Sequence, residues 1–228
     1  MSDKKQKNNQ ESTNGLMDKL KNPKFLGIIG VILIILIGGF WYIKVNNSAN
    51  NAEAQIALSR ARVIYDKGEF LAAINGDSIV KYSKSEKPLG LKGVSEEFSS
   101  TDAGKIASLM LGNCYLGLSK LKEAKEAYEK ASSSSSSIIR SGSYAGIAAI
   151  LELEGKSVDA AEEYLKAVKE DKEELNASDY IFNAAKNYEK GGKKDEAINS
   201  YKEVVVKFEN SNASAEAKMA LAKLNITI

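Results

Sequence analysis

Residue types that usually carry catalysis or bind metal ions are scarce in this sequence. It has no histidine, so the most common metal ligand and the usual general base are both missing. Its single cysteine, Cys114, cannot form an internal disulfide, and its place in an apolar-periodic segment predicts a small buried side chain. Three adjacent glutamate pairs fit solvated helix faces better than paired catalytic acids: Glu96–Glu97, Glu162–Glu163 and Glu173–Glu174.

No glycine-rich loop of the kind that holds phosphates is present either. Serine–lysine catalysis stays formally open, but no motif indicates it. We therefore predict a protein that is not an enzyme and that uses neither a cofactor nor a metal ion. The residues with informative spacing are instead those that pack helices together.

An alanine, a tyrosine and a small apolar residue recur at fixed spacing in the second half of the chain. The tyrosine follows the alanine by four residues and the small residue follows the tyrosine by three, which places all of them on one helix face. The copies are Ala124–Tyr128–Ala131, Ala160–Tyr164–Ala167 and Ala197–Tyr201–Val204. They recur after 36 and then 37 residues, and another apolar-periodic segment precedes each one. This pattern predicts helical hairpins that bury a core by stacking on their neighbours.

The first copy resembles the tetratricopeptide repeat. Six residues match signature positions of that family in order: Leu111, Gly112, Tyr115, Ala124, Tyr128 and Ala131. The resemblance implies an all-α fold, an α-solenoid of stacked hairpins, with repeats at about 105–138, 141–174 and 178–211. A generic helical bundle is the alternative, but helix packing alone sets no period of this length.

The array is expected to extend at both ends, so that the repeat domain spans 53–228. Residues 53–75 indicate a degenerate hairpin, and residues 89–100 a further amphipathic helix. Residues 213–224 indicate a closing helix, which a solenoid needs to cover its last apolar face. Between two repeats, the serine run 132–137 is typical of a flexible or loosely helical connection.

An apolar segment near the N-terminus predicts a membrane anchor. Residues 25–43 carry no charge and would form a helix about 28 Å long, close to the thickness of the bilayer core. We therefore expect a transmembrane helix at 25–45 between a disordered tail, 1–24, and a linker, 46–52. Six lysines lie in the tail, whereas Lys44 has no further Lys or Arg after it before Arg60. This asymmetry places the tail in the cytoplasm and the repeats on the other side of the membrane.

A cleavable signal peptide is the competing interpretation of the same segment. Ala52-Glu53-Ala54 is a small-residue pattern of the kind found at cleavage sites, so cleavage after Ala54 stays open. The pattern lies well beyond the apolar run, and the lead-in of 24 residues is long for a signal peptide. We prefer the anchor for these reasons.

The charge of the part that is expected to be exported argues against a nucleic-acid partner. From residue 45 onward there are 25 Lys and Arg against 27 Asp and Glu. No basic patch with interleaved aromatic residues is present. We expect protein partners, and no nucleic acid or small-molecule substrate.

The resemblance also implies where a partner binds. In tetratricopeptide arrays the first helix of each hairpin lines a concave groove. Mapped onto this sequence, the groove residues are Leu109, Asn113 and Leu116 in the first repeat, Ala145, Ala149 and Glu152 in the second, and Phe182, Lys186 and Glu189 in the third. The same apolar residues could instead pack against a neighbouring helix, and the sequence leaves that open.

The layout as a whole resembles a more particular family, the single-span ancillary subunit of the bacterial Sec translocon. The segments 65–70, 75–77 and 97–104 are similar to its members. The resemblance implies an inner-membrane protein with periplasmic repeats, whose partners are translocon subunits and a membrane-anchored prolyl isomerase-type chaperone. A scaffold of another envelope assembly machine and a client-binding periplasmic chaperone are the alternatives.

Overall fold

The computed structural model describes residues 50–76 and 89–227, and every regular element in these ranges is a helix. The predicted tail 1–24, the predicted anchor 25–45 and most of the predicted linker 46–52 lie outside them. None of the described helices is long and apolar enough to cross a membrane. The anchor, the side of the membrane and cleavage after Ala54 therefore stay predictions.

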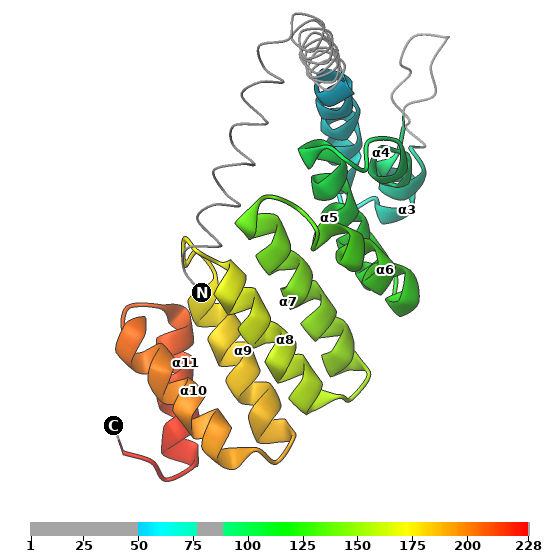
Figure 1. Ribbon diagram of the computed structural model, residues 1–228. Helices are drawn as coiled ribbons and strands as arrows, with labels where there is room; N and C mark the ends of the chain where they lie inside the picture. The colour runs from blue at the N-terminus through cyan, green and yellow to red at the C-terminus, as the bar shows by residue number, and fades with distance from the viewer. Residues whose placement is uncertain (1–49, 77–88, 228) are drawn as a thin grey trace, which may run out of the picture. The chain divides into compact units, whose positions relative to one another are not determined.

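The helices follow one another as stacked hairpins (Figure 1). An unlabelled helix at 50–65 precedes the first labelled one. The others are α3 (Phe70–Asn75), α4 (Leu91–Glu97), α5 (Asp102–Gly117), α6 (Leu121–Ala131), α7 (Ser137–Leu153), α8 (Ser157–Glu170), α9 (Ala177–Lys190), α10 (Lys194–Lys207) and α11 (Asn212–Lys223). From α4 to α11, each helix packs against the next. This is the all-α stacking that the repeat spacing predicted.

The first helix of each complete hairpin ends in the same tight turn. A residue with positive φ ends it: Ser119 at 57°, Gly155 at 76° and Gly192 at 77°. Its amide donates to the carbonyl three residues earlier, and the next amide donates to the carbonyl five residues before itself. These bonds satisfy carbonyls that a helix end leaves open, and glycine takes this conformation without steric cost. We call the positive-φ residue the turn residue.

The earliest hairpin departs from this spacing because its second helix is split. Its turn residue, Gly68, lies 51 residues before Ser119, whereas the later turn residues are 36 and 37 residues apart. The excess matches the length of segment 76–90, which separates α3 from α4. Both ends of that segment meet, since a Cβ on Gly90 would lie 2.3 Å from the Gly76 nitrogen. Helix α4 therefore begins where α3 ends, and the two together occupy the place of one second helix.

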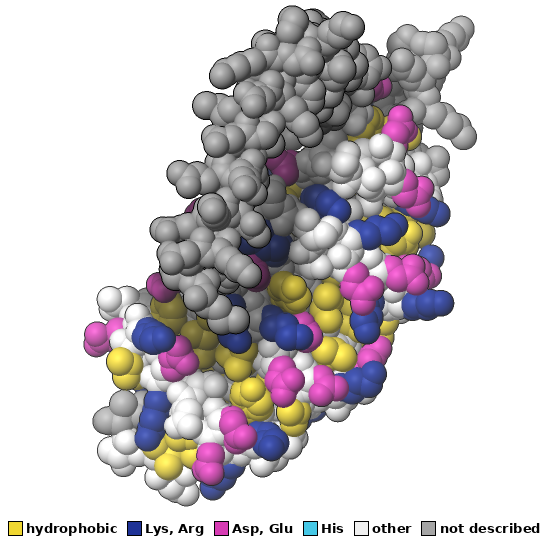
Figure 2. All heavy atoms as spheres, in the orientation of Figure 1, with side chains coloured by type: hydrophobic (Ala, Val, Ile, Leu, Met, Phe, Trp, Pro, Cys, Tyr) yellow, Lys and Arg dark blue, Asp and Glu magenta, His cyan; other side chains and the backbone are white. Residues whose placement is uncertain are grey.

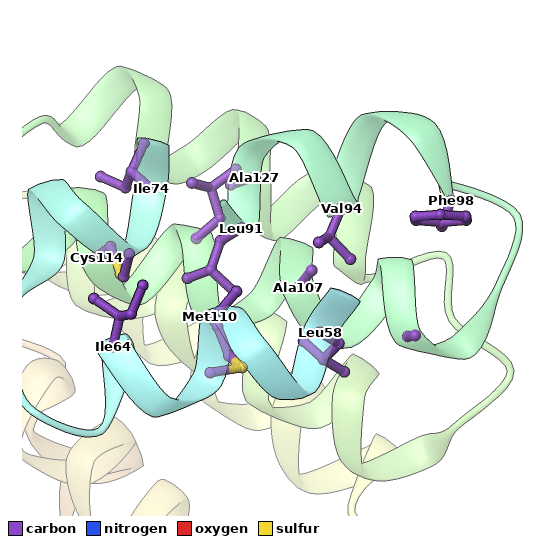
Figure 3. Packing of buried hydrophobic residues seen from close by; sticks show 14 of the residues in the cluster. Leu58, Ile64, Ile74, Leu91, Val94, Phe98, Ala107, Met110, Cys114 and Ala127 are labelled. Atoms are coloured by element: carbon purple, nitrogen blue, oxygen red, sulfur yellow. The ribbon is translucent and has the colours of Figure 1, made fainter. Parts of the chain in front are cut away.

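The core of this N-terminal part is built from five consecutive helices (Figure 3). Leu91 and Val94 of α4 are fully buried, and Phe98 just after α4 is nearly so. They pack in one cluster with residues of helix 50–65, α3, α5 and α6. At about 25 cal/mol for each Å² of apolar surface removed from water, such side chains are the main stabilising term of the stack. The sequence indicated a separate helix at 89–100; the structure describes a shorter one that continues the preceding hairpin.

The serine run 132–137 is held in place, which differs from the flexible connection that its composition indicated. Ser134 is buried, and Arg140 at the start of α7 donates to the carbonyl oxygens of Ser134 and Ser135 at 2.9 and 2.8 Å. The Arg140 Nε also lies 2.6 Å from a carboxylate oxygen of Glu170 at the end of α8. One guanidinium thus ties the loop to two helices, because it offers five donors in a fixed planar geometry.

Candidate functional site

The repeated tyrosines are core residues whose hydroxyl groups extend toward the first helices. Tyr128 and Tyr201 are 1% exposed and Tyr164 is 7% exposed. The Tyr128 ring lies between two glycines, because a Cβ on Gly112 of α5 or on Gly146 of α7 would come within 2.6 Å of it. The repeated spacing of alanine, tyrosine and small residue is therefore the stripe by which a second helix packs on the first helices beside it.

Two of these hydroxyl groups are bound to predicted groove residues. The Tyr128 hydroxyl donates to the Asn113 Oδ1 at 2.7 Å, and the Tyr201 hydroxyl donates to the Glu189 Oε2 at 2.8 Å. For the third tyrosine, burial is the largest cause of a raised pKa, and Glu152, also a predicted groove residue, raises the pKa of Tyr164 further. The hydroxyls therefore reach the surface that the first helices present. Burial, which is the larger cause, and the hydrogen bond to Glu189 raise the pKa of Tyr201 well above its ordinary value.

Asn113 joins two hairpins. Its Oδ1 accepts from the Tyr128 hydroxyl, and its Nδ2 donates to the Tyr65 hydroxyl at 3.1 Å. Tyr65 lies three residues before Gly68, the same place that Leu116 has before Ser119, so it belongs to the same surface. Sequence reasoning missed Tyr65 because it mapped groove residues only on the three complete repeats and not on the degenerate first hairpin. The glycine at position 68 was the signal that could have found it.

None of the nine predicted groove residues is fully buried. Asn113, Lys186 and Glu189 are exposed. The others are half-buried: Leu109, Leu116, Ala145, Ala149, Glu152 and Phe182. They occupy three equivalent positions on α5, α7 and α9, counted back from the turn residue. Partner binding at these residues stays a prediction.

The third repeat brings its predicted residues together with a core tyrosine. The Phe182 ring packs against the Tyr201 ring with centroids 5.7 Å apart. The Lys186 Nζ lies 5.6 Å from the centroid of Phe182, within the range of a cation–π contact. Phe182 is therefore both a surface residue and a packing residue. In the first repeat, Leu109 likewise lies against α7, since a Cβ on Gly142 would be 3.5 Å from its Cδ2.

Chemistry beyond binding has little support among these residues. Cys114 is fully buried, as its sequence position predicted, and burial raises the pKa of its thiol to about 11. A thiol with a raised pKa is a poor nucleophile at neutral pH. In the part of the chain that the structure describes, no three or more His, Cys, Asp or Glu side chains gather in a way that could hold a metal ion.

Two of the hairpins match models of a known protein family. Residues 107–137, over α5 and α6, match a tetratricopeptide repeat model, and so do residues 179–211, over α9 and α10. The chain contains tetratricopeptide repeats. The predicted repeat family is thereby confirmed for the first and third repeats, and α7 and α8 form a hairpin of the same build between them.

Tetratricopeptide repeats indicate a protein that binds other proteins. On the face of the molecule that Figure 2 shows, acidic and basic side chains are interspersed with hydrophobic ones, without a field of one sign. Such a mixed surface suits a protein partner better than a nucleic acid. No curated protein in the comparison matches the chain. The resemblance to the Sec translocon subunit therefore stays a prediction.

Proposed function

We propose that this chain is a membrane-anchored adaptor that holds a protein partner in the groove formed by the first helices of its repeats. One observation carries the proposal. Leu109, Ala145 and Phe182 occupy the same position on α5, α7 and α9, and none of them is fully buried. A row of half-buried apolar side chains flanked by exposed polar ones is what an interface needs at its centre and its rim.

Anchoring of this adaptor is proposed from the sequence. The uncharged segment 25–43, with six lysines before it, supports a single span with the tail in the cytoplasm and the repeats in the periplasm. A tether confines the partner near the membrane, so that even a weak contact is well occupied. Protease added to spheroplasts should remove the repeats and spare the tail. Protected repeats would reverse the proposed orientation.

The layout supports a more specific role as an accessory subunit of the Sec translocon that links it to periplasmic chaperones. A scaffold of another envelope machine and a chaperone that binds unfolded clients directly are the other candidates. Pull-down from solubilised membranes separates the first two, because the captured subunits differ. The last predicts that the isolated repeats suppress aggregation of a denatured client.

The groove is best tested from residues that are not packing residues. A photo-crosslinking side chain at Ala149 or Lys186, in intact cells, should capture the partner. The matched control is Glu162, which is exposed on the second helix α8. Substitution Lys186→Glu should weaken capture by roughly tenfold, the effect of one well-placed interface contact. Phe182→Ala is a poorer probe, since it also removes a contact with Tyr201. Capture from Glu162 with none from α7 or α9 would place the contact on the outer face instead.

A further inference from the structure

The last helix, α11, has the features of a first helix. It begins at Ser211, whose side chain accepts a hydrogen bond from the Ser214 amide at 3.0 Å, as Thr101 does at the start of α5. The turn after α11 contains Asn225, which has a φ of 59°. The Asn225 amide donates three residues back and the Ile226 amide five residues back, as at the turns after α5, α7 and α9. Each of those turns leads into a second helix, whereas no described helix follows α11.

One face of α11 is packed and the adjacent face is open. Ala213, Ala217 and Leu221 are buried against the preceding hairpin. The seventh residue before the turn residue behaves differently. In α5, α7 and α9 it is small and buried beside the tyrosine of its own second helix: Gly112, Ala148 and Ala185. In α11 this position is Lys218, and it is exposed.

A cavity of about 790 Å³ lies along this open face. Its walls come from α10, the turn before α11, α11 itself and the turn that follows it: Val205, Glu209, Lys218, Ala222, Asn225, Ile226 and Thr227. The apolar residues Val205, Ala222 and Ile226 are combined with a lysine and a glutamate. None of the nine predicted groove residues lines it, so this surface is distinct from the groove.

We propose that this cavity is a docking site for one amphipathic α-helix of a partner protein, which takes the place of a second helix beside α11. The preceding hairpins show what covers this face, namely a helix with a small residue, an aromatic residue four positions later and a small residue three positions after that. At the aromatic position, the covering helix would face Lys218 instead of a glycine or alanine. A tyrosine ring that packs on glycine or alanine has no room beside a lysine side chain, whereas a carboxylate there pairs with the ammonium group. The docked helix therefore carries an acidic residue at the tyrosine position.

The test uses the full-length chain and two synthetic probes based on its own second helix α8. Both peptides span residues 156–170 and are held helical by a lactam bridge on the outer face. One carries Tyr164→Glu and the other Tyr164→Lys. Fluorescence anisotropy should show that the wild-type chain binds the glutamate peptide about tenfold more tightly than the lysine peptide, because like charges oppose docking. Lys218→Glu should reverse this order.

Two alanines of α11 provide a matched pair of variants. Ala222→Trp fills the cavity and should weaken binding of the glutamate peptide at least about tenfold, whereas Ala215→Trp, exposed on α11 outside the cavity lining, should leave it unchanged. Equal affinities for both peptides, no saturable binding of either, or equal effects of the two tryptophans would overturn the proposal. A second copy of the chain is the alternative occupant, and sedimentation equilibrium tests for it. A wild-type dimer that Ala222→Trp dissociates would make this face a contact between copies of the chain. That result would also overturn the proposal.

Discussion

The Tyr128 hydroxyl donates a hydrogen bond of 2.7 Å to the Asn113 Oδ1, across the two helices of one hairpin. Asn113 in turn donates to Tyr65 of the preceding hairpin, so one exposed amide links the buried Tyr128 to the half-buried Tyr65 of a neighbouring hairpin. A residue that sequence reasoning assigned to partner binding is therefore also a structural link. Substitution of Asn113 tests binding and stability together, and the two effects must be measured separately.

The hydrogen bond between Tyr128 and Asn113 should appear as a coupling energy. Tyr128→Phe and Asn113→Ala should each lower the free energy of unfolding by about 0.5–1.5 kcal/mol, the usual net value of one hydrogen bond. The double variant should lose less than the sum of the two, because both changes remove the same bond. Urea unfolding of the four proteins measures this cycle. Strict additivity would show that the bond contributes nothing to stability.

Two glycines on α7 should respond to alanine in opposite directions. A Cβ on Gly146 would lie 2.4 Å from the Tyr128 ring, which Gly112 confines from another side, so Gly146→Ala should destabilise by about 1–3 kcal/mol through overpacking. A Cβ on Gly142 would lie at an ordinary contact distance, 3.5 Å from Leu109. Gly142→Ala should therefore stabilise by roughly 0.5–1 kcal/mol through helix propensity. Thermal melts that shift in the same direction for both would contradict this packing.

Arg140 should contribute more to the stability of the protein than a lysine in its place would. It bonds two carbonyls of the serine run and the carboxylate of Glu170, and its side chain is 21% exposed. We expect Arg140→Ala to cost about 1–3 kcal/mol, since partly buried acceptors lose their donor. Arg140→Lys should recover only part of the loss, because an ammonium group lacks the planar set of donors. Hydrogen exchange of amides 132–136 should speed up in both variants; full recovery by lysine would show that charge alone is enough.

The stability of the protein should fall at alkaline pH. Burial, as the largest cause, raises the pKa of Tyr164 from 10.0 to about 12, and it raises that of Cys114 from 9.0 to about 11. The folded state therefore keeps protons that the unfolded state releases. This stabilisation is complete below about pH 9 and is lost progressively as pH rises toward 12. Melting temperatures measured across this window check the prediction.

Single substitutions show which titrating groups cause the loss of stability at alkaline pH. Tyr164→Phe and Cys114→Ala each remove a titrating group, so each should flatten the decline of melting temperature between pH 9 and 12. Their stabilities at pH 7 differ from the wild type for other reasons, and only the slopes are compared. Curves that run parallel to the wild type would show that other groups set the alkaline limit.

The sequence by itself determined the hairpins and their packing stripes. Spacings of three, four and about 36 residues are properties of one helix or one hairpin, so they can be read without knowing which segments meet. The core tyrosines and the burial of Cys114 follow from this periodicity. The tetratricopeptide matches at 107–137 and 179–211 fall on the segments where the spacing is most regular.

Only the tertiary structure decided how segments distant in the sequence share one site. Gly76 and Gly90 meet and make one second helix of α3 and α4, which no local periodicity indicates. Arg140 reaches Glu170 and holds a serine run that composition alone describes as flexible. In the sequence, Lys218 does not differ from other exposed lysines. The packing shows that the residues at the equivalent position of α5, α7 and α9 are buried under a second helix. Such contacts depend on which surfaces are brought together by packing, and side-chain type along the chain does not specify that pairing.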